Sequence, residues 1–202
     1  MSKSICALVH KPGSTREAFQ AYYESNHAPL AIGLFPFNGY VRNHLVDPGD
    51  FGWDTISEFW SDDIDKAAAL MAGPIGDTMR ADEERFMDRS RIAPGGAEET
   101  ILSPGEPADP SGRRTALFLS YDAEAELADA ARAYAGRLAK DHSGVSLDVV
   151  SPWSEPAFPA RAVIWLPGWV ELEAAPAGIA MRTLRASRVA SSPEALLGTR
   201  VA

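Results

Sequence analysis

Cysteine is almost absent from this chain of 202 residues, because Cys6 is the only one. One cysteine cannot form an internal disulfide, and Cys6 lies in an apolar stretch, so we expect a small buried side chain rather than a reactive thiol. This usage fits a reducing cytoplasm. The chain also lacks apolar runs of about 18 residues and has no apolar leader after its first lysine, so neither a membrane span nor secretion is expected.

Basic residues are outnumbered. The chain has 19 Lys and Arg against 28 Asp and Glu, which gives a formal net charge of −9 and a pI near 4.9. Affinity for nucleic acids comes mainly from clustered basic side chains that neutralise phosphates. Arg113 and Arg114 form the densest basic pair. We therefore expect neither nucleic acid nor an anionic membrane surface as a partner.

Motifs for metals and cofactors are missing as well. The four histidines, His10, His27, His44 and His142, are dispersed, and none has the spacing of a zinc site. The chain has no dinucleotide-binding glycine motif, no Walker lysine loop and no GxSxG motif, and "GGAEE" at 95–99 has too little context for a phosphate loop. We expect no metal and no cofactor, so an enzyme would act through its side chains alone.

Apolar periodicity in the first half predicts six elements in the order β-α-β-β-α-β. The first helix is expected to begin at Ser14, which has a capping-box spacing to Glu17. The second helix is expected over 62–72. The four strands are expected at 4–10, 39–46, 53–61 and around 87–92.

Residues 102–113 hold three prolines and two glycines, which is typical of a linker. The same order of elements then recurs, with strands at 114–121, 144–153, 161–169 and 181–190 and helices at 122–142 and 170–180. We therefore divide the chain into a repeat at 1–101 that carries the candidate site, the linker, and a second repeat at 114–202.

The six-element order is that of the ferredoxin-like βαββαβ unit. Each unit covers one face of its sheet with helices and leaves the other face bare, and a bare apolar face needs a cover. We therefore predict an α+β protein in which two ferredoxin-like repeats form an intramolecular, pseudo-dimeric α/β barrel, with a small cavity between sheet and helices in each half.

A histidine stands out on the first expected helix. His27 lies four residues after Tyr23 and eight after Phe19, on the same helical face as these aromatic residues. It is either a hydrogen-bonded structural residue or an acid/base group, because an imidazole near its ordinary pKa can take up and return a proton. Pro29 removes a backbone donor and predicts a distortion of the helix beside it.

Further polar residues of the first half can assist His27. Asp54 can orient the imidazole through its other nitrogen, and Tyr22 or Tyr23 can donate to a substrate oxygen. The catalytic candidates are therefore His27, Tyr23 and Asp54. The substrate-binding candidates share positions beside apolar neighbours: Tyr22, Arg42, Asn43, Trp60 and Phe86.

Simpler interpretations compete with these assignments. Arg42 can be one half of a structural ion pair with a carboxylate such as Asp88, and Trp60 and Phe86 can be core residues. The charged run "ADEER" at 81–85 is typical of a solvated helix face.

Several segments together resemble the EthD family of dimeric α/β-barrel proteins: "KPGSTREAFQAYYESNHAPLA", "YVRN", "DTISEFW" and "ADEERFMDRSR". The resemblance runs from the first strand to about residue 100. It implies the ferredoxin-like unit, the paired barrel and a functional role for His27. It also implies similarity to cofactor-free enzymes that tailor aromatic polyketides by oxygenation, decarboxylation or dehydration. His10 departs from the family, which commonly has an arginine there.

The second repeat departs further. Aligning Asp122 with Ser14 places aliphatic residues where the first repeat has its aromatic and polar set: Leu127 under Phe19, Ala130 and Ala131 under the tyrosines, and Ala135 under His27. We therefore expect a degenerate second repeat that serves mainly as scaffold.

These observations favour a cofactor-independent enzyme in which His27 moves a proton on an apolar aromatic or cyclic small molecule, with a lyase or isomerase outcome such as dehydration or decarboxylation, in secondary metabolism or catabolism. One alternative is a cofactor-free monooxygenase of anthrone-like substrates. A second is a non-catalytic small-molecule-binding protein. Haem handling, as in other barrels of this shape, requires an axial ligand in an open pocket. The fused barrel can also associate into a homodimer.

Overall fold

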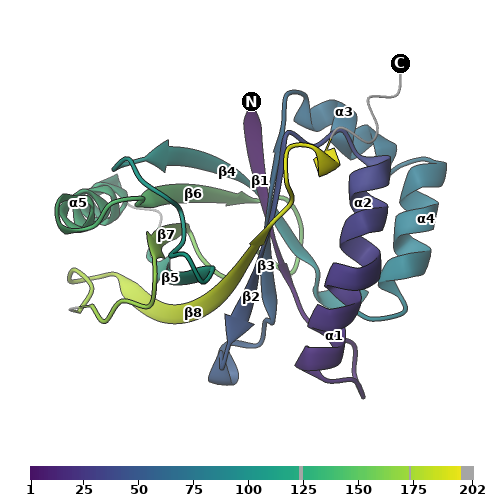
Figure 1. Ribbon diagram of the computed structural model, residues 1–202. Coiled ribbons are helices and arrows are strands. Elements are labelled where there is room, and N and C mark those ends of the chain that lie inside the picture. Colours follow the sequence, from purple (N-terminus) through teal and green to yellow (C-terminus); the bar gives the residue numbers. More distant parts are fainter. Residues whose placement is uncertain (123–124, 173, 197–202) are drawn as a thin grey trace.

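A computed structural model describes residues 1–122, 125–172 and 174–196, and within these ranges eight strands close into one antiparallel barrel with helices outside it (Figure 1). The strands follow one another around the barrel in the order β1-β3-β2-β8-β5-β7-β6-β4. The predicted α+β barrel is therefore confirmed.

The first half supplies four strands and most of the helices. Its strands are β1 (Ser2–Leu8), β2 (Gly39–Val46), β3 (Thr55–Ser61) and β4 (Ala93–Ile101). Its helices are α1 (Arg16–Tyr22), the π-helix η1 (Tyr23–His27), α2 (Ala28–Leu34), the 3-10 helix η2 (Gly49–Phe51), α3 (Ile64–Leu70), α4 (Pro74–Glu83) and the 3-10 helix η3 (Arg89–Arg91). Thr15, and not Ser14, caps α1, because its side chain accepts the N–H of Ala18.

The described residues of the second half contribute four more strands and one long helix. These elements are β5 (Arg113–Ser120), α5 (Ala125–Asp141), β6 (Ser146–Pro152), β7 (Ala162–Pro167) and β8 (Ala180–Ala190). The helix expected at 170–180 is not found in the described part of that segment, where Ile179 donates its N–H to Pro176 in a turn. Residue 173 lies outside the described residues.

The fourth strand was expected too early in the sequence. Residues 89–91 form η3, and the strand is β4, which begins at Ala93. Its sequence, APGGAEETI, contains proline and two glycines and has a low intrinsic preference for a strand. It is nevertheless a strand because β1 and β6 pair with it on its two sides. The expectation of a strand at "MDRSRI" is therefore wrong by about six residues.

The two halves have the same strand order. Within the barrel, β4-β1-β3-β2 are neighbours in the first half and β8-β5-β7-β6 in the second, so each sheet runs fourth, first, third, second strand. Two seams join the halves, where β2 pairs with β8 and β4 pairs with β6. This arrangement confirms the two ferredoxin-like repeats. The division of the chain at 102–113 stays a prediction.

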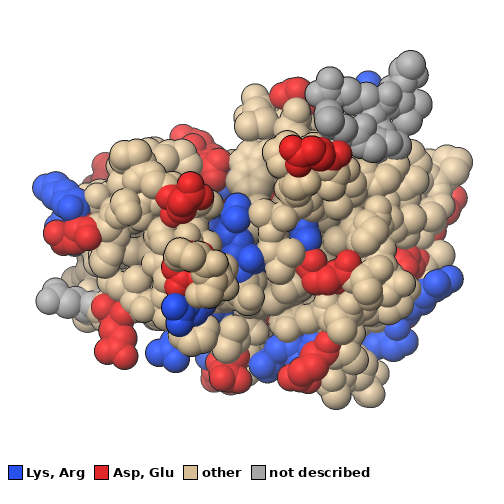
Figure 2. Space-filling view, viewed as in Figure 1, with Lys and Arg blue, Asp and Glu red and all other residues tan. Residues whose placement is uncertain are grey.

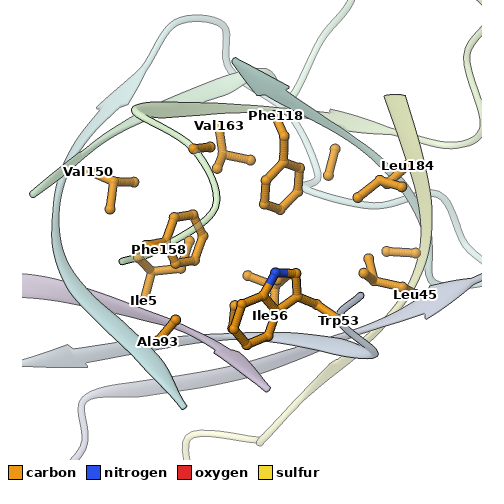
Figure 3. Packing of buried hydrophobic residues seen from close by; sticks show 14 of the residues in the cluster. Ile5, Leu45, Trp53, Ile56, Ala93, Phe118, Val150, Phe158, Val163 and Leu184 are labelled. Carbon is orange, nitrogen blue, oxygen red and sulfur yellow. The ribbon is translucent and has the colours of Figure 1, made fainter. Parts of the chain in front are cut away.

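Side chains alternate between the two faces of each strand. On β1, Ile5 and Ala7 point into the barrel, whereas Cys6 and Leu8 point toward the helices. Residues of both halves meet inside the barrel, where Figure 3 shows Trp53, Phe118 and Phe158 among aliphatic neighbours. The two bare sheet faces therefore cover each other, as the sequence predicts.

Helices cover the outer faces unequally. In Figure 1, α1, α2, α3 and α4 lie together on one side of the barrel and α5 lies on the other. Under α5 the buried residues include Ala131 and Ala135, which pack with aliphatic side chains of β5, β6 and β7. Under α1, α2 and α4 the cluster is rich in aromatic residues and contains Phe19 and Tyr23. The cavity described next lies on this aromatic side.

Candidate functional site

A cavity of about 230 Å³ lies between the helices of the first half and the outer face of β1, β2 and β3. It is lined mainly by apolar and aromatic side chains, among them Cys6, Tyr23, His27, Phe35, Phe37, Tyr40, Phe59, Met71, Met79, Met87 and Trp153. An engineered apolar cavity of roughly 150 Å³ already binds benzene. The cavity therefore has room for a small ring compound.

Trp153 belongs to the second half, immediately after β6. Its N–H donates to Pro94 of the first half, and Pro94 also lines the cavity. The cavity wall is thus completed by a residue from the second half of the chain.

His27 is positioned by a π-helix. The N–H of Ala28 donates to Tyr23, five residues back, and Pro29 has no N–H to donate to Ser25. The distortion predicted beside Pro29 is therefore present as η1, just before the proline. It brings Tyr23 and His27 onto the buried side, with ring centroids 4.9 Å apart. Single π-turns within helices are frequent at functional sites.

Asp82 holds the imidazole of His27. His27 is 5% exposed, and its Nδ1 lies 2.8 Å from Oδ2 of Asp82. An ionised carboxylate can only accept, so Nδ1 carries the hydrogen and Nε2 keeps its lone pair. Among the described residues, Nε2 has no hydrogen-bond partner. His27 lines the cavity, and its Nε2 is therefore able to accept a proton.

Burial lowers the pKa of His27, and the neighbouring carboxylate of Asp82 only partly offsets this effect. The imidazole is therefore neutral near pH 7, which is the form that can accept a proton. Tyr22 donates its hydroxyl to the other oxygen of Asp82 at 2.8 Å, so the carboxylate is held from both sides.

Two tyrosines line the cavity beside His27. The hydroxyl of Tyr40 donates to that of Tyr23 at 2.7 Å, and Tyr23 lies 2.9 Å from the hydroxyl of Ser57. Burial raises the pKa of Tyr23 and Tyr40. Both phenols therefore stay protonated and can serve as hydrogen-bond donors, not as bases.

Two further ionisable groups line the cavity. Burial raises the pKa of Glu83, although Arg89 lies 3.1 Å from its carboxylate and acts in the opposite direction. Burial also raises the pKa of the Cys6 thiol to about 12, so this cysteine is not a thiolate. The sequence predicts that Cys6 is buried, but in the structure it is only half-buried.

Asp54 does not reach His27. Its Oδ2 lies 2.6 Å from Nδ1 of His10, and its Oδ1 accepts from Nε of Arg16 at 3.2 Å. Its backbone N–H is bonded to Leu8, which fixes it at the end of β1. The sequence predicts that Asp54 orients the imidazole of His27. In the structure Asp82 holds that position instead.

None of the five residues expected to bind substrate is part of the wall of this cavity. Tyr22 contacts Asp82, and Phe86 stacks on Tyr22 with ring centroids 4.8 Å apart. Asn43 and Trp60 point into the barrel, because strand side chains alternate and their neighbours Arg42 and Phe59 point toward the helices.

Arg42 pairs with Glu24 and not with Asp88. Its Nη2 lies 2.7 Å from the carboxylate of Glu24, which also lies 2.8 Å from Nε2 of His44. These two bases outweigh burial and lower the pKa of Glu24 to about 2. Because Glu24 belongs to η1, this cluster ties the π-helix to β2 and helps to place His27.

Asp82 is not among the site residues predicted from the sequence, because the run "ADEER" is typical of a solvated helix face. Most of that run is exposed, but Asp82 is buried. Met79 precedes it by three residues, and Phe86 follows it by four, and both are buried. This spacing marks one helix face and is the signal that could have found Asp82.

Neither a metal set nor a membrane helix is found in the described part of the chain. No three His, Cys, Asp or Glu side chains there come together as metal ligands. No helix there is long and apolar enough to cross a membrane.

Comparison with known proteins identifies relatives of this arrangement. Residues 11–90 match the EthD domain. An EthD family protein from Bacillus halodurans C-125 is 19% identical, covers 47% of this chain and 97% of its own, and has a TM-score of 0.36. No curated protein sequence matches the chain.

Two other solved structures align over most of this chain. A protein of Lactobacillus acidophilus NCFM, described as a candidate monooxygenase, is 14% identical, covers 95% of this chain and 96% of its own, and has a TM-score of 0.50. A structure described as a candidate chlorite dismutase is 10% identical and covers 98% of this chain and 97% of its own, with a TM-score of 0.44.

Proposed function

Because this chain carries an EthD domain at residues 11–90 within a tandem dimeric α/β barrel, we propose that it is a cofactor-independent enzyme that moves a proton on an apolar cyclic small molecule. The observation that carries the proposal is the environment of His27. His27 lines an apolar cavity, its Nδ1 is held by Asp82, and its Nε2 is free to accept a proton.

The roles follow from the contacts. His27 is the catalytic base, and a placed base of this kind contributes about 10² to 10⁴-fold in rate. Asp82 is a positioning residue that fixes the tautomer of His27. Tyr23 and Tyr40 line the cavity as protonated phenols. Because Tyr40 donates its hydroxyl to Tyr23, the hydroxyl of Tyr23 is the one that can donate to an oxygen of the substrate.

The cavity favours a planar ring. Phe35 and Phe37 stack with centroids 5.3 Å apart, and Tyr40 and Phe59 with centroids 4.8 Å apart, and all four residues line the cavity. Aromatic side chains bind rings by stacking or edge-to-face contact. His27 itself is only 5% exposed, which limits the access of bulk water to its ring.

We favour a lyase or isomerase outcome. Removal of a proton from an acidic C–H or phenol, followed by its return to a departing oxygen or to another carbon, completes a dehydration or an isomerisation. Such a reaction needs a base, a hydrogen-bond donor to hold the substrate oxygen, and a dry cavity. His27, Tyr23 and the apolar lining fill these roles.

Cofactor-free monooxygenation is the second candidate. It begins with the same proton removal, after which the electron-rich substrate anion reduces dioxygen. The apolar lining favours this candidate because dioxygen dissolves well in apolar surroundings. Measuring oxygen uptake during turnover separates the two: a lyase or isomerase consumes none.

His27→Gln tests the proposal. A panel of hydroxylated one- and two-ring aromatic compounds, anthrone among them, should include a molecule that binds and is converted. In the folded variant, turnover should fall by about 10² to 10⁴-fold, while affinity changes only a few-fold. His142→Gln in the second half is the matched control. Equal turnover in wild type and His27→Gln would show that His27 is not the catalytic base. Binding without turnover in wild type would instead make the chain a non-catalytic binding protein.

A further inference from the structure

A second cavity, of about 260 Å³, lies at one end of the barrel interior. Its wall includes Trp60, Glu99, Arg114, Ser146 and Arg188, which come from five different strands of both halves. The His27 cavity lies on the opposite face of β3, which Phe59 lines from that side. The two cavities are therefore separate sites.

Ionic side chains are concentrated beside this cavity. Nζ of Lys3 lies 2.7 Å from the nearest oxygen of each of three carboxylates, those of Glu58, Glu99 and Asp148. Arg114 donates through Nη1 to Glu58 and to Asn43. Buried charges in a protein interior are stable only when they are paired.

Each carboxylate of this group is already engaged by other partners. Glu58 accepts from Asn43 as well as from Arg114, and Glu99 accepts from the indole N–H of Trp60 at 2.9 Å. Asp148 accepts from the indole N–H of Trp165 at 2.7 Å. The acids are thus directed toward Lys3, Arg114 and the two indoles.

Arg188 differs from these groups because its guanidinium has an atom without a partner. Its Nε is buried and has no hydrogen-bond partner in the described part of the chain, and the same is true of Nε of Arg114. Arg114 is 3% exposed and Arg188 is half-buried, and both line the cavity. A buried N–H of a guanidinium group without a partner is costly, so an acceptor from outside would stabilise this end of the barrel.

Two loops approach each other closely at the rim of the cavity. Gly105 and Gly144 line it, and the N–H of Gly144 donates to Pro104 at 3.0 Å. A Cβ at Gly144 would lie 2.1 Å from the carbonyl oxygen of Glu106, so only glycine allows the two loops to meet there. The segment expected to be a mere linker thus forms one wall of the cavity. Figure 2 shows some basic side chains near the middle of the view, where strands of both halves converge in Figure 1, and others along its lower edge.

We propose that this cavity binds the oxyanion group, a carboxylate or a phosphate, of a small molecule, through the guanidinium groups of Arg188 and Arg114. Guanidinium groups bind planar and tetrahedral oxyanions by charge-assisted, often bidentate hydrogen bonds. Trp60 and Val145 add apolar wall for the rest of the molecule. The proposal is independent of the reaction at His27.

The test titrates the full chain with sodium succinate, sodium phosphate and, at equal ionic strength, sodium chloride. Thermal unfolding and calorimetry follow binding. We expect at least one of the two oxyanions to raise Tm in a saturable way, while chloride does not. Which of the two binds more tightly distinguishes an organic acid from a phosphate.

Variants locate the effect. Arg188→Gln should weaken oxyanion binding by at least about tenfold, because a charge-assisted hydrogen bond is lost. Arg188→Lys keeps the positive charge but loses the planar guanidinium group. Its affinity for the oxyanion should therefore lie between that of the wild type and that of Arg188→Gln. Arg185→Gln is the matched control, because Arg185 lies on the same strand, is exposed, and stands over Trp169.

The oxyanion-free protein gives a second measurement. Arg188→Gln should not lower Tm in chloride, because it removes a half-buried charge that repels Arg114. The proposal is overturned if neither oxyanion produces a saturable shift. It is overturned as well if Arg188→Gln binds as tightly as wild type does, or if the shift matches that of chloride at equal ionic strength.

Discussion

Asp82 and His27 form the central pair of the candidate site, with Oδ2 of the carboxylate 2.8 Å from Nδ1 of the ring. The pair joins two elements of the first half, because Asp82 lies on α4 and His27 ends the π-helix η1. Phe86 packs on the ring of His27 with centroids 5.1 Å apart. These contacts hold the imidazole in one orientation.

Asp82→Asn tests this positioning. The amide keeps the shape of the side chain but removes the charge that selects the tautomer of His27, so kcat/KM should fall by about 10 to 10²-fold with little change in KM. Loss of the carboxylate should also lower the pKa of His27 further, since Asp82 acts to raise it. The acid limb of the pH–rate profile should then move to lower pH.

Asp77→Asn is the control for that variant, because Asp77 lies on the same helix and is exposed. An Asp82→Asn enzyme with an unchanged profile and unchanged kcat would show that Asp82 is structural only.

The pH dependence of stability gives a second prediction. The folded pKa of His27 is lowered from its ordinary value of about 6.5, so below that pH the unfolded chain takes up a proton that the folded chain resists. Stability from this group is therefore fully present above about pH 6.5 and is lost as the pH falls toward the folded pKa, at up to about 1.4 kcal/mol per pH unit.

Urea unfolding between pH 5 and pH 8 measures this effect. The free energy of unfolding should fall more steeply with decreasing pH in the wild-type protein than in His27→Gln, which cannot titrate at this position. Parallel curves for the two proteins would show that the pKa of His27 is not lowered on folding.

A third prediction concerns the space in the cavity. Ala31 lies on α2 and lines the cavity, so the larger side chain in Ala31→Leu should occupy part of the space that a ligand needs. Affinity for a ring compound should fall by about tenfold, while stability changes by no more than about 1 to 3 kcal/mol. Calorimetric titration of the ligand measures the loss.

Ala18→Leu makes the same change at an exposed position of α1 and should leave affinity unaltered. If Ala31→Leu binds as wild type does, the ligand lies elsewhere.

A fourth prediction concerns Lys3, the centre of the buried ionic group. Burial alone would lower its pKa, but the three carboxylates together raise it above its ordinary value. Lys3→Met leaves these acids without their common cation and should lower the free energy of unfolding by about 3 to 5 kcal/mol. Adding Asp148→Asn should recover part of that loss, because one buried charge is removed.

Urea unfolding of the single and double variants, with Lys140→Met as an exposed control, measures both effects. A loss below about 1 kcal/mol in Lys3→Met would mean that this group is solvated and screened like a surface pair.

The sequence predicts the barrel well because period-two strands and a repeated element order are local signals. β2 lies where it was expected, at 39–46. β4 was expected in the wrong place because its strand conformation depends on its two neighbours, and pairing of that kind leaves no trace in local composition.

The candidate site was predicted only in part for a similar reason. His27, Tyr23 and the distortion at Pro29 could be found because they share one helix. Asp82 is 55 residues away in the sequence, so its contact with His27 depends on the packing of α4. The face of Asn43 and Trp60 depends on strand register, where a shift by one residue reverses the direction of a side chain.

The two seams, β2 with β8 and β4 with β6, close the ring from a single polypeptide. In a ring assembled from two identical chains, every substitution is made twice and any change in one helix is imposed on its mate. In this single chain, Ala135 of the second half and His27 of the first half, which align in the sequence, are encoded separately. One position can therefore carry alanine while the other carries histidine. Within the described part of the chain, His27 lines one such cavity, so a ligand bound there should saturate at one equivalent per polypeptide.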